Sequence, residues 1–144
     1  MFDLHTVIQR ENVGFNRELG IRLIEVRDSF ACGEIKLEEK HLNPFGNVHG
    51  GSIFTLMDTI GGVAASTQGN FVATSSSAIT FLNPASKGDT LIARAEKIKN
   101  GKSLLIYELT VTTEKEVLIA KATFTYFRLP QKIADAWASG AKAE

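Results

Sequence analysis

The sequence of 144 residues predicts an α+β fold in which one long helix is covered by a six-stranded antiparallel sheet. Two observations lead to this prediction. Residues 50–67 carry one apolar stripe at helical spacing, whereas most of the remaining chain consists of strand-like runs. Tight turns join the later strands, and such turns connect antiparallel neighbours. Because the apolar stripe needs a surface to cover it, we expect a twisted sheet wrapped around the helix.

The segment before the long helix predicts one short helix and one hairpin. Residues 3–12 form a short amphipathic pattern. Two strand-like runs follow, at residues 19–27 and 30–38, and Asp28 and Ser29 between them are typical turn residues. These runs supply the first two strands of the sheet.

The long helix has an unusual composition for an apolar element. Its stripe recurs at spacings of three and four and consists of Ile53, Leu56, Met57, Ile60, Val63 and Ala64. One acid, Asp58, and two glycines, Gly61 and Gly62, lie within it. A glycine inside a helix costs roughly 1 kcal/mol relative to alanine. We therefore expect a strand, a second helix or a ligand to approach the helix closely there.

Four further strands complete the predicted sheet, at residues 71–82, 90–99, 104–113 and 117–128. Asn100-Gly101 is a strong two-residue hairpin signal, and residues 114–116 form the next turn. One face of the last strand carries Leu118, Ala120, Ala122, Phe124 and Tyr126. Pro130 is expected to end this strand, and residues 131–144 to form a short helix that frays.

The composition narrows the functional classes. Sixteen basic and sixteen acidic residues cancel, which argues against a general nucleic-acid or membrane-surface binder. No stretch approaches the ~18 apolar residues of a membrane span. The N-terminus lacks a signal-peptide pattern, and the single cysteine, Cys32, has no intrachain partner, so we expect a cytoplasmic protein. His5, His41 and His49 lack ligand spacing, so we expect no metal.

The spacing of Gly50 and Asp58 predicts a dimer if both serve one site. Eight residues separate them, which is about 12 Å along a helix axis and about 800° of turn. The two groups therefore cannot meet within one chain. Two antiparallel, offset copies of the helix would bring Asp58 of one chain near Gly50 of the other. A composite active site thus requires a homodimer.

Each half of such a site has a chemical use. The first amides of a helix lack intrahelical partners and carry partial positive charge. Glycine at positions 50 and 51 lets a ligand approach those amides, which favours an oxyanion-stabilising site. Asp58 would act as a general base on water or as a nucleophile. The alternatives are a solvent-facing acid at Asp58, a chain turn at Gly50 and Gly51, and a capping role for His49.

The sequence also resembles a known family. Residues 43–51, Asn-Pro-Phe-Gly-Asn-Val-His-Gly-Gly, followed by Leu-Met-Asp ending at Asp58, resemble the hotdog-fold acyl-CoA thioesterases of the phenylacetic-acid-degradation (PaaI-like) type. Residues 78–91 and 99–111 resemble the segments that follow in that family, and the likeness covers residues 15–128. It implies one hotdog domain over the whole chain, with a short N-terminal helix and a C-terminal tail outside its core. It also implies dimers that pair into tetramers, and hydrolysis of acyl-CoA to a carboxylic acid and free CoA.

The resemblance implies roles for individual catalytic residues. Asp58 would be the base or the nucleophile. The Gly50 amide, helped by Asn43, would polarise the thioester carbonyl, and His49 would support the loop and the thioester end. A hydroxyl on the strand after the helix would orient the water.

For that hydroxyl we favour Thr74, then Ser75. The residues that would contact the substrate are Gly51, Phe54, Met57, Phe81, Lys99 and Lys102. The two lysines flank the Asn100-Gly101 turn and would hold the CoA phosphates. The reaction needs no metal and no cofactor, since the CoA thioester is itself the substrate.

Other functions remain open on the sequence alone. The same fold supports acyl-thioester hydratases or dehydratases, but these carry a histidine paired with an acid in other sequence settings. A non-catalytic acyl-CoA binding protein and a purely structural oligomer are further alternatives. The acyl group is also open between an aryl group and a short or medium chain.

Overall fold

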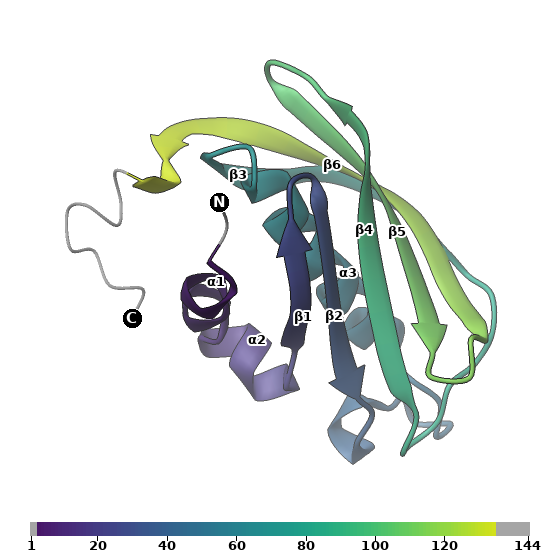
Figure 1. Ribbon diagram of the computed structural model, residues 1–144. Helices are drawn as coiled ribbons and strands as arrows, with labels where there is room; N and C mark the ends of the chain where they lie inside the picture. The colour runs from purple at the N-terminus through teal and green to yellow at the C-terminus, as the bar shows by residue number, and fades with distance from the viewer. Residues whose placement is uncertain (1–2, 135–144) are drawn as a thin grey trace.

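The computed structural model describes residues 3–134 as a curved sheet wrapped around one long helix (Figure 1). The helices are α1 (Leu4–Glu11), α2 (Gly14–Leu19), the 3-10 turn η1 (Glu39–His41) and α3 (Gly50–Ser66). The strands are β1 (Arg22–Arg27), β2 (Phe30–Lys36), β3 (Asn70–Phe81), β4 (Thr90–Asn100), β5 (Leu104–Thr113) and β6 (Leu118–Lys132). The predicted α+β class is confirmed.

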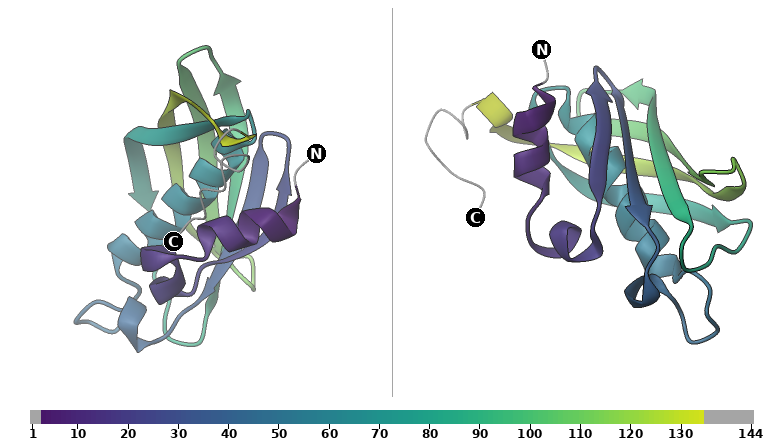
Figure 2. Two further views of the ribbon diagram at one scale, coloured as in Figure 1. Left: turned by 90° about the vertical axis from the view of Figure 1, so that its left-hand side faces the viewer. Right: turned by 60° about the horizontal axis from the view of Figure 1, so that its bottom comes forward.

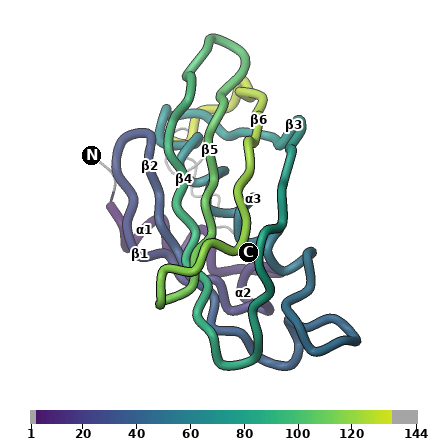
Figure 3. The backbone as a smooth tube through the Cα atoms, turned by 90° about the vertical axis from the view of Figure 1, so that its right-hand side faces the viewer, coloured from purple at the N-terminus to yellow at the C-terminus, as the bar shows by residue number. Residues whose placement is uncertain are grey.

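The six strands form one antiparallel sheet in the order β1-β2-β4-β5-β6-β3. Figure 3 shows this order from the outer side of the sheet, with α3 behind it. β3 follows α3 in the chain but pairs with β6, so it forms one edge of the sheet and β1 the other. The long outer edge of β3 has no partner strand within residues 3–134.

The core lies between α3 and the inner face of the sheet. The predicted stripe is confirmed, since all six of its residues are buried: Ile53, Leu56, Met57, Ile60, Val63 and Ala64. The predicted inner face of β6 is also buried from Ala120 to Tyr126, in alternation with more exposed residues. The helix and the sheet therefore pack against each other through the apolar faces that the helical and the strand periodicity of the sequence predict.

Gly61 is required by the contact between α3 and β6. A Cβ atom on Gly61 would lie 2.1 Å from the Tyr126 hydroxyl oxygen, whereas one on Gly62 would lie 3.8 Å from the nearest atom of the Tyr126 ring. The close approach expected at this glycine pair is thus made by a strand of the same chain. It lets the Tyr126 hydroxyl donate to the Asp58 carbonyl oxygen over 3.1 Å.

Two short helices pack on α3 from the side away from the middle of the sheet (Figure 2, left). Arg10 of α1 donates to the Ser66 hydroxyl, and the Thr59 hydroxyl donates to Asn16 of α2. The predicted N-terminal helix is confirmed as α1, but α2 was not predicted. Its end is marked by Gly20 in the left-handed conformation, with φ 76°.

Two sequence predictions about strand ends are wrong. The β4–β5 turn is centred on Lys102 and Ser103, because the Gly101 N–H donates to the Leu104 carbonyl over 2.8 Å. β6 continues through Pro130 to Lys132. This is tolerated because the register between β3 and β6 shifts there, and beyond Arg128 the strand pairs only with β3. Residues 131 and 132 therefore belong to β6. The part of the predicted tail helix from residue 135 onward falls outside the described residues.

Candidate active site

The loop before α3 is organised by Asn43. Its side-chain oxygen accepts from the backbone N–H groups of Phe45 and Asn47, over 2.9 and 3.1 Å. The Asn43 backbone N–H donates to the Asn47 carbonyl over 2.7 Å, which closes the turn. Within residues 3–134 the Asn43 side-chain NH2 group has no acceptor, so it is available to a ligand.

His41 anchors the same loop from beneath and was not predicted to do so. Its ring is buried, with Nδ1 accepting from the Glu38 N–H and Nε2 contacting the Leu19 carbonyl over 2.8 Å. Its backbone carbonyl accepts from the His49 N–H and from the Ser52 hydroxyl. His41 therefore joins the end of α2 to the start of α3.

His49 caps α3 and leaves one amide free. Its Nδ1 accepts from the Gly51 N–H over 2.8 Å, so the hydrogen of the neutral ring lies on Nε2. The Gly50 N–H has no partner among the described residues. Of the two predicted glycine amides, only Gly50 is open to an incoming oxygen, and it points along the positive end of the helix dipole.

Asp58 lies two turns further along α3 and is partly buried. The Thr74 hydroxyl donates to its Oδ1 atom over 2.6 Å. The register between β3 and β6 shifts between Thr74 and Ser76, which makes Ser75 the extra residue of a bulge. Bulges redirect nearby side chains and are frequent beside active sites. The structure thus brings Thr74, and not Ser75, into contact with the carboxylate.

Tyr126 holds the backbone of Asp58 in place. Burial raises the pKa of the Tyr126 hydroxyl well above its usual value, and the nearby Asp58 charge raises it further. The hydroxyl therefore keeps its proton and remains a donor to the Asp58 carbonyl. The glycine pair in α3, together with the inward-facing Tyr126 in the last strand, is the sequence signal for this contact.

A cavity of about 340 Å³ opens beside Asp58. Its lining comes from α1, α2, α3, β3 and β6 and includes Arg10, Asn16, Asp58, Thr59, Val63 and Thr74. Arg10 and Asn16 were not predicted as site residues, because the packing of the N-terminal helices on α3 has no signature in the sequence. The volume lies within the range of small-molecule sites.

Gly50 and Asp58 do not meet within one chain. Both lie on α3, about 12 Å apart along its axis. Gly50 does not line the cavity beside Asp58. Each chain thus carries two separate half-sites.

The predicted substrate-contacting residues lie in different surroundings. Phe54 and Phe81 are 38% and 54% exposed, and the Phe81 ring would lie 3.3 Å from a Cβ atom placed on Gly50. Met57 is fully buried in the core, so the structure does not place it where a ligand could contact it. Lys99 and Lys102 are exposed near the tip of the β4–β5 hairpin.

That hairpin adjoins the C-terminal end of α3, far from Gly50 of the same chain. Ser29 connects the two, because its side chain accepts from both Asn100 and Gln68. If the lysines bind the phosphates of CoA, they serve a site whose helix N-terminus comes from another chain.

Residues 3–134 contain no group of three His, Cys, Asp or Glu side chains placed to hold a metal ion. Burial raises the pKa of the Cys32 thiol, which disfavours the thiolate that a nucleophile requires.

Among the described helices, none has both the length and the apolar content for crossing a membrane.

Comparison with known proteins identifies relatives that match most of this chain. The thioesterase superfamily matches residues 45–120, which include Gly50, Asp58 and Thr74. Acyl-coenzyme A thioesterase PaaI of Escherichia coli (strain K12) is 32% identical over 110 residues, covering 76% of this chain and 79% of that protein.

Two solved structures share the fold at similar identity. The E. coli PaaI protein from the phenylacetic acid degradation operon has a TM-score of 0.83 and 29% identity, covering 89% of this chain and 91% of that one. A Streptococcus mutans protein bound to acetyl-CoA has a TM-score of 0.76 and 30% identity, covering 78% and 91% of the two chains. The predicted hotdog fold is therefore confirmed.

Proposed function

This chain belongs to the thioesterase superfamily, and on that premise we propose that it hydrolyses acyl-CoA thioesters to a carboxylic acid and free CoA. The observation that carries the proposal is the hydrogen-bonded pair of Asp58 and Thr74 beside a cavity. Asp58 also lies at the distance from Gly50 along α3 that a site shared between two chains needs. The acyl-CoA thioesterase PaaI of E. coli and the acetyl-CoA complex of the S. mutans protein support the choice of substrate.

The proposed chemistry uses Asp58 as a general base. Thr74 occupies its Oδ1 atom, which leaves Oδ2 to accept a proton from water, while the Thr74 oxygen can accept a second hydrogen from the same water. The water oxygen attacks the thioester carbonyl carbon, and the carbonyl oxygen gains negative charge. The tetrahedral intermediate then expels the CoA thiolate, which takes up the proton that Asp58 gained from the water.

The developing oxyanion would be stabilised by Gly50 of a second chain. The Gly50 N–H, which has no partner among residues 3–134, would donate to the oxygen at the partial positive end of the α3 dipole. One such donor contributes roughly 3 kcal/mol of transition-state stabilisation. The NH2 group of Asn43, which has no acceptor among residues 3–134, would assist from the preceding loop. His49 would fix this loop through its cap on Gly51.

We propose that β3 forms the dimer interface. It is an edge strand of 12 residues, and six consecutive residues, 73–78, are exposed. An exposed edge of this length is a template for pairing with another strand. Antiparallel pairing of two β3 edges would set two α3 helices antiparallel, which is the orientation that brings Asp58 of one toward Gly50 of the other.

We further propose a homotetramer in the cytoplasm. The outer face of the sheet exposes Leu104 and Phe127, which are paired across β5 and β6 and form an apolar group suited to contact between dimers. Cys32 is a buried free thiol, which is compatible with a reducing compartment. Light scattering of the purified protein and cell fractionation test these two statements.

The function is tested by hydrolysis of a panel of acyl-CoA substrates, followed with a free-thiol reagent. Wild-type protein should release CoA, and Asp58→Asn should lower kcat/KM by roughly 100- to 10,000-fold, the usual contribution of a general base. The variant should keep its melting temperature and its affinity for CoA. Undiminished hydrolysis by Asp58→Asn would remove Asp58 from the mechanism. A wild type that hydrolyses no acyl-CoA would reduce the protein to a binding module.

A further inference from the structure

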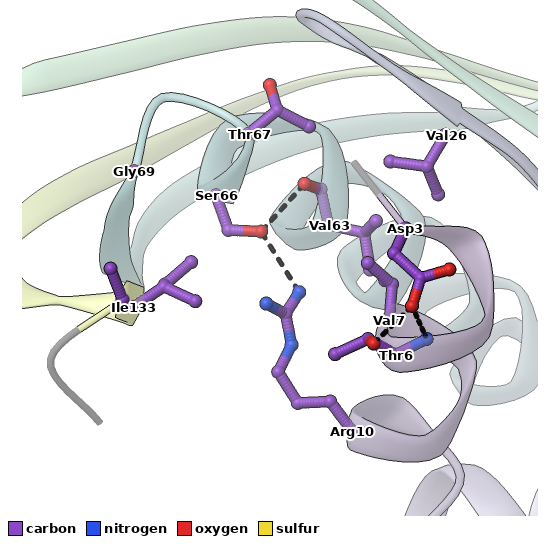
Figure 4. Close-up of a pocket in the computed structure, with 11 residues that line it drawn as sticks. Asp3, Thr6, Val7, Arg10, Val26, Val63, Ser66, Thr67, Gly69 and Ile133 are labelled. Atoms are coloured by element: carbon purple, nitrogen blue, oxygen red, sulfur yellow. Dashed lines mark hydrogen bonds between the residues drawn. The ribbon is translucent and has the colours of Figure 1, made fainter. Parts of the chain in front are cut away.

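A second cavity of about 340 Å³ lies beneath α1 and is separate from the cavity beside Asp58 (Figure 4). We call it the α1 cavity. Its lining includes the aliphatic side chains of Val7, Val26 and Ile133. It shares three lining residues with the cavity beside Asp58, namely Arg10, Val63 and Ser66. The two cavities are therefore neighbours with a common boundary.

The Arg10 side chain stands at this boundary and is held there by two bonds. It rises from α1, and its Nη2 atom donates to the Ser66 hydroxyl on α3 over 3.2 Å (Figure 4). Its Nε atom donates to the Glu11 carboxylate over 2.9 Å. The side chain is only 14% exposed, and bonds in partly buried surroundings restrict its conformation. A bond between α1 and α3 thus separates the two spaces.

The same wall is braced by α2. The Asn16 side chain donates to the Glu11 carbonyl oxygen over 3.2 Å and accepts from the Thr59 hydroxyl over 3.0 Å. Arg10, Asn16 and Thr59 all line the cavity beside Asp58, so its polar wall is already bonded within the chain. This network joins α1, α2 and α3 and makes the wall a preformed part of the cavity.

The charges in the cavity beside Asp58 favour the acyl group of a CoA thioester over its phosphates. Among the described residues that line it, Arg10 is the one cation, and Glu11 matches its charge. Asp58 adds a further negative charge. Phosphates bind where cations are open to them, which is not the case here. An uncharged acyl group beside Asp58 meets no such conflict.

The distance from Asp58 to Ser66 limits the length of an acyl chain in this cavity. The two residues are eight positions apart on α3, about 12 Å along the axis. Gly62 lies midway and also lines the cavity, so the space follows this face of the helix. An extended chain advances about 1.2 Å per bond, because the three backbone bonds of a residue span at most about 3.6 Å. About ten bonds, or about eleven carbons, therefore reach from a carbonyl at Asp58 to the wall.

We propose that Arg10 and Ser66 form the end wall of the acyl pocket, and that this wall restricts the substrates to acyl chains of about ten carbons or fewer. The proposal rests on the thioesterase function proposed above and adds the residues that set the upper length of the acyl chain. The thioester carbonyl lies at Asp58, and the chain extends past Gly62 toward Ser66. A longer chain would have to displace the bonded Arg10 side chain.

The test compares kcat/KM for butanoyl-, octanoyl-, decanoyl-, tetradecanoyl- and hexadecanoyl-CoA, each below its micelle concentration. The best substrate of the wild type should have about ten carbons or fewer. The length ratio is kcat/KM for tetradecanoyl-CoA divided by that for this best substrate. Arg10→Ala removes the wall and opens the α1 cavity to the end of the chain. It should raise the length ratio by roughly tenfold or more, since a single methylene in an apolar pocket is worth about that factor.

Two further variants separate the wall from general effects on the fold. Ser66→Ala removes the hydroxyl that holds the Arg10 head group but keeps the arginine. It should raise the length ratio by less than Arg10→Ala, and it carries the test if Arg10→Ala does not fold. Arg17→Ala is the matched control, because Arg17 is an exposed arginine on α2 that lines neither cavity. It should leave the length ratio unchanged. Melting curves establish which variants are folded.

Two results would overturn the inference while leaving the thioesterase function intact. One is a wild type whose best substrate is tetradecanoyl- or hexadecanoyl-CoA. The other is an unchanged length ratio in folded Arg10→Ala, or in Ser66→Ala if only that variant folds. Absence of hydrolysis by the wild type for every substrate would instead refute the proposed function itself.

Discussion

At the scale of single residues, Asp58 is held by two contacts from different strands. Thr74 of β3 donates to its carboxylate, and Tyr126 of β6 donates to its carbonyl oxygen. One contact fixes the side chain and the other fixes the backbone beneath it. A base held in this way loses little freedom when substrate arrives, which is the purpose of preorganisation in a catalytic site.

The Thr74 contact leads to a prediction on activity. Thr74→Val keeps the shape of the side chain but removes the hydroxyl, and a hydrogen bond to a charged group is worth about 1.5–3 kcal/mol. We expect kcat/KM for the best acyl-CoA to fall by roughly ten- to a hundredfold. Thr74→Ser keeps the hydroxyl and should stay near wild type in the same assay. Wild-type kcat/KM in Thr74→Val would show that the hydroxyl has no part in the reaction.

Sequence patterns could predict Asp58 and Gly50, but Thr74 was ranked before Ser75 only through the resemblance to the family, because the local pattern of β3 does not distinguish its hydroxyls. The choice depends on the bulge at Ser75, which changes the strand register between Thr74 and Ser76. A register shift of this kind follows from pairing with β6, which no local pattern encodes. Met57 is a different case. Its place in the apolar stripe already predicts burial in the core, which the structure confirms, and this burial argues against the substrate contact that was also expected of it.

At the scale of elements, the packing of α3 on β6 depends on one of two adjacent glycines. A methyl group at Gly61 would collide with the Tyr126 hydroxyl, whereas at Gly62 it would make an ordinary contact. We expect Gly61→Ala to lower the free energy of unfolding by about 1–3 kcal/mol. Gly62→Ala should raise it by up to about 1 kcal/mol, because alanine favours the helix.

Urea denaturation of the two variants measures this difference. Tyr126→Phe should recover part of the loss in Gly61→Ala, because it removes the nearest clashing atom. The packing account is wrong if Gly61→Ala and Gly62→Ala change stability equally.

Several element boundaries were beyond prediction for physical reasons. The long helix and its apolar stripe were predicted because burial imposes one period over 17 residues. The six residues of α2 are too few to display a period, and none of them is buried. Asn100 was assigned to the turn but donates to Ser29 and accepts from Tyr107 instead. These side-chain bonds hold Asn100 in the strand and move the turn to Lys102 and Ser103.

At the scale of the whole molecule, one chain carries both halves of the proposed catalytic site, and these halves cannot meet within that chain. The free Gly50 amide lies at one end of α3, and Asp58 lies about 12 Å along it. The exposed edge of β3 offers the surface through which a second chain would complete each half. In a two-fold dimer the composite site would then occur twice.

Complementation between two inactive variants tests this composite site most directly. Gly50→Pro removes the free N–H, and it suits the first position of the helix because His49 is extended, with φ −69° and ψ 135°. Asp58→Asn removes the base. Each variant alone should be nearly inactive. A mixed dimer contains one site with both groups intact and one with neither.

The decisive measurement is the acyl-CoA hydrolase activity of the two variants after co-expression or joint refolding at equal amounts. Random pairing makes half of the dimers mixed, each with one working site, so we predict about a quarter of wild-type activity. Activity no greater than the sum of the two separate variants, in a sample shown to contain mixed dimers, would contradict the composite site.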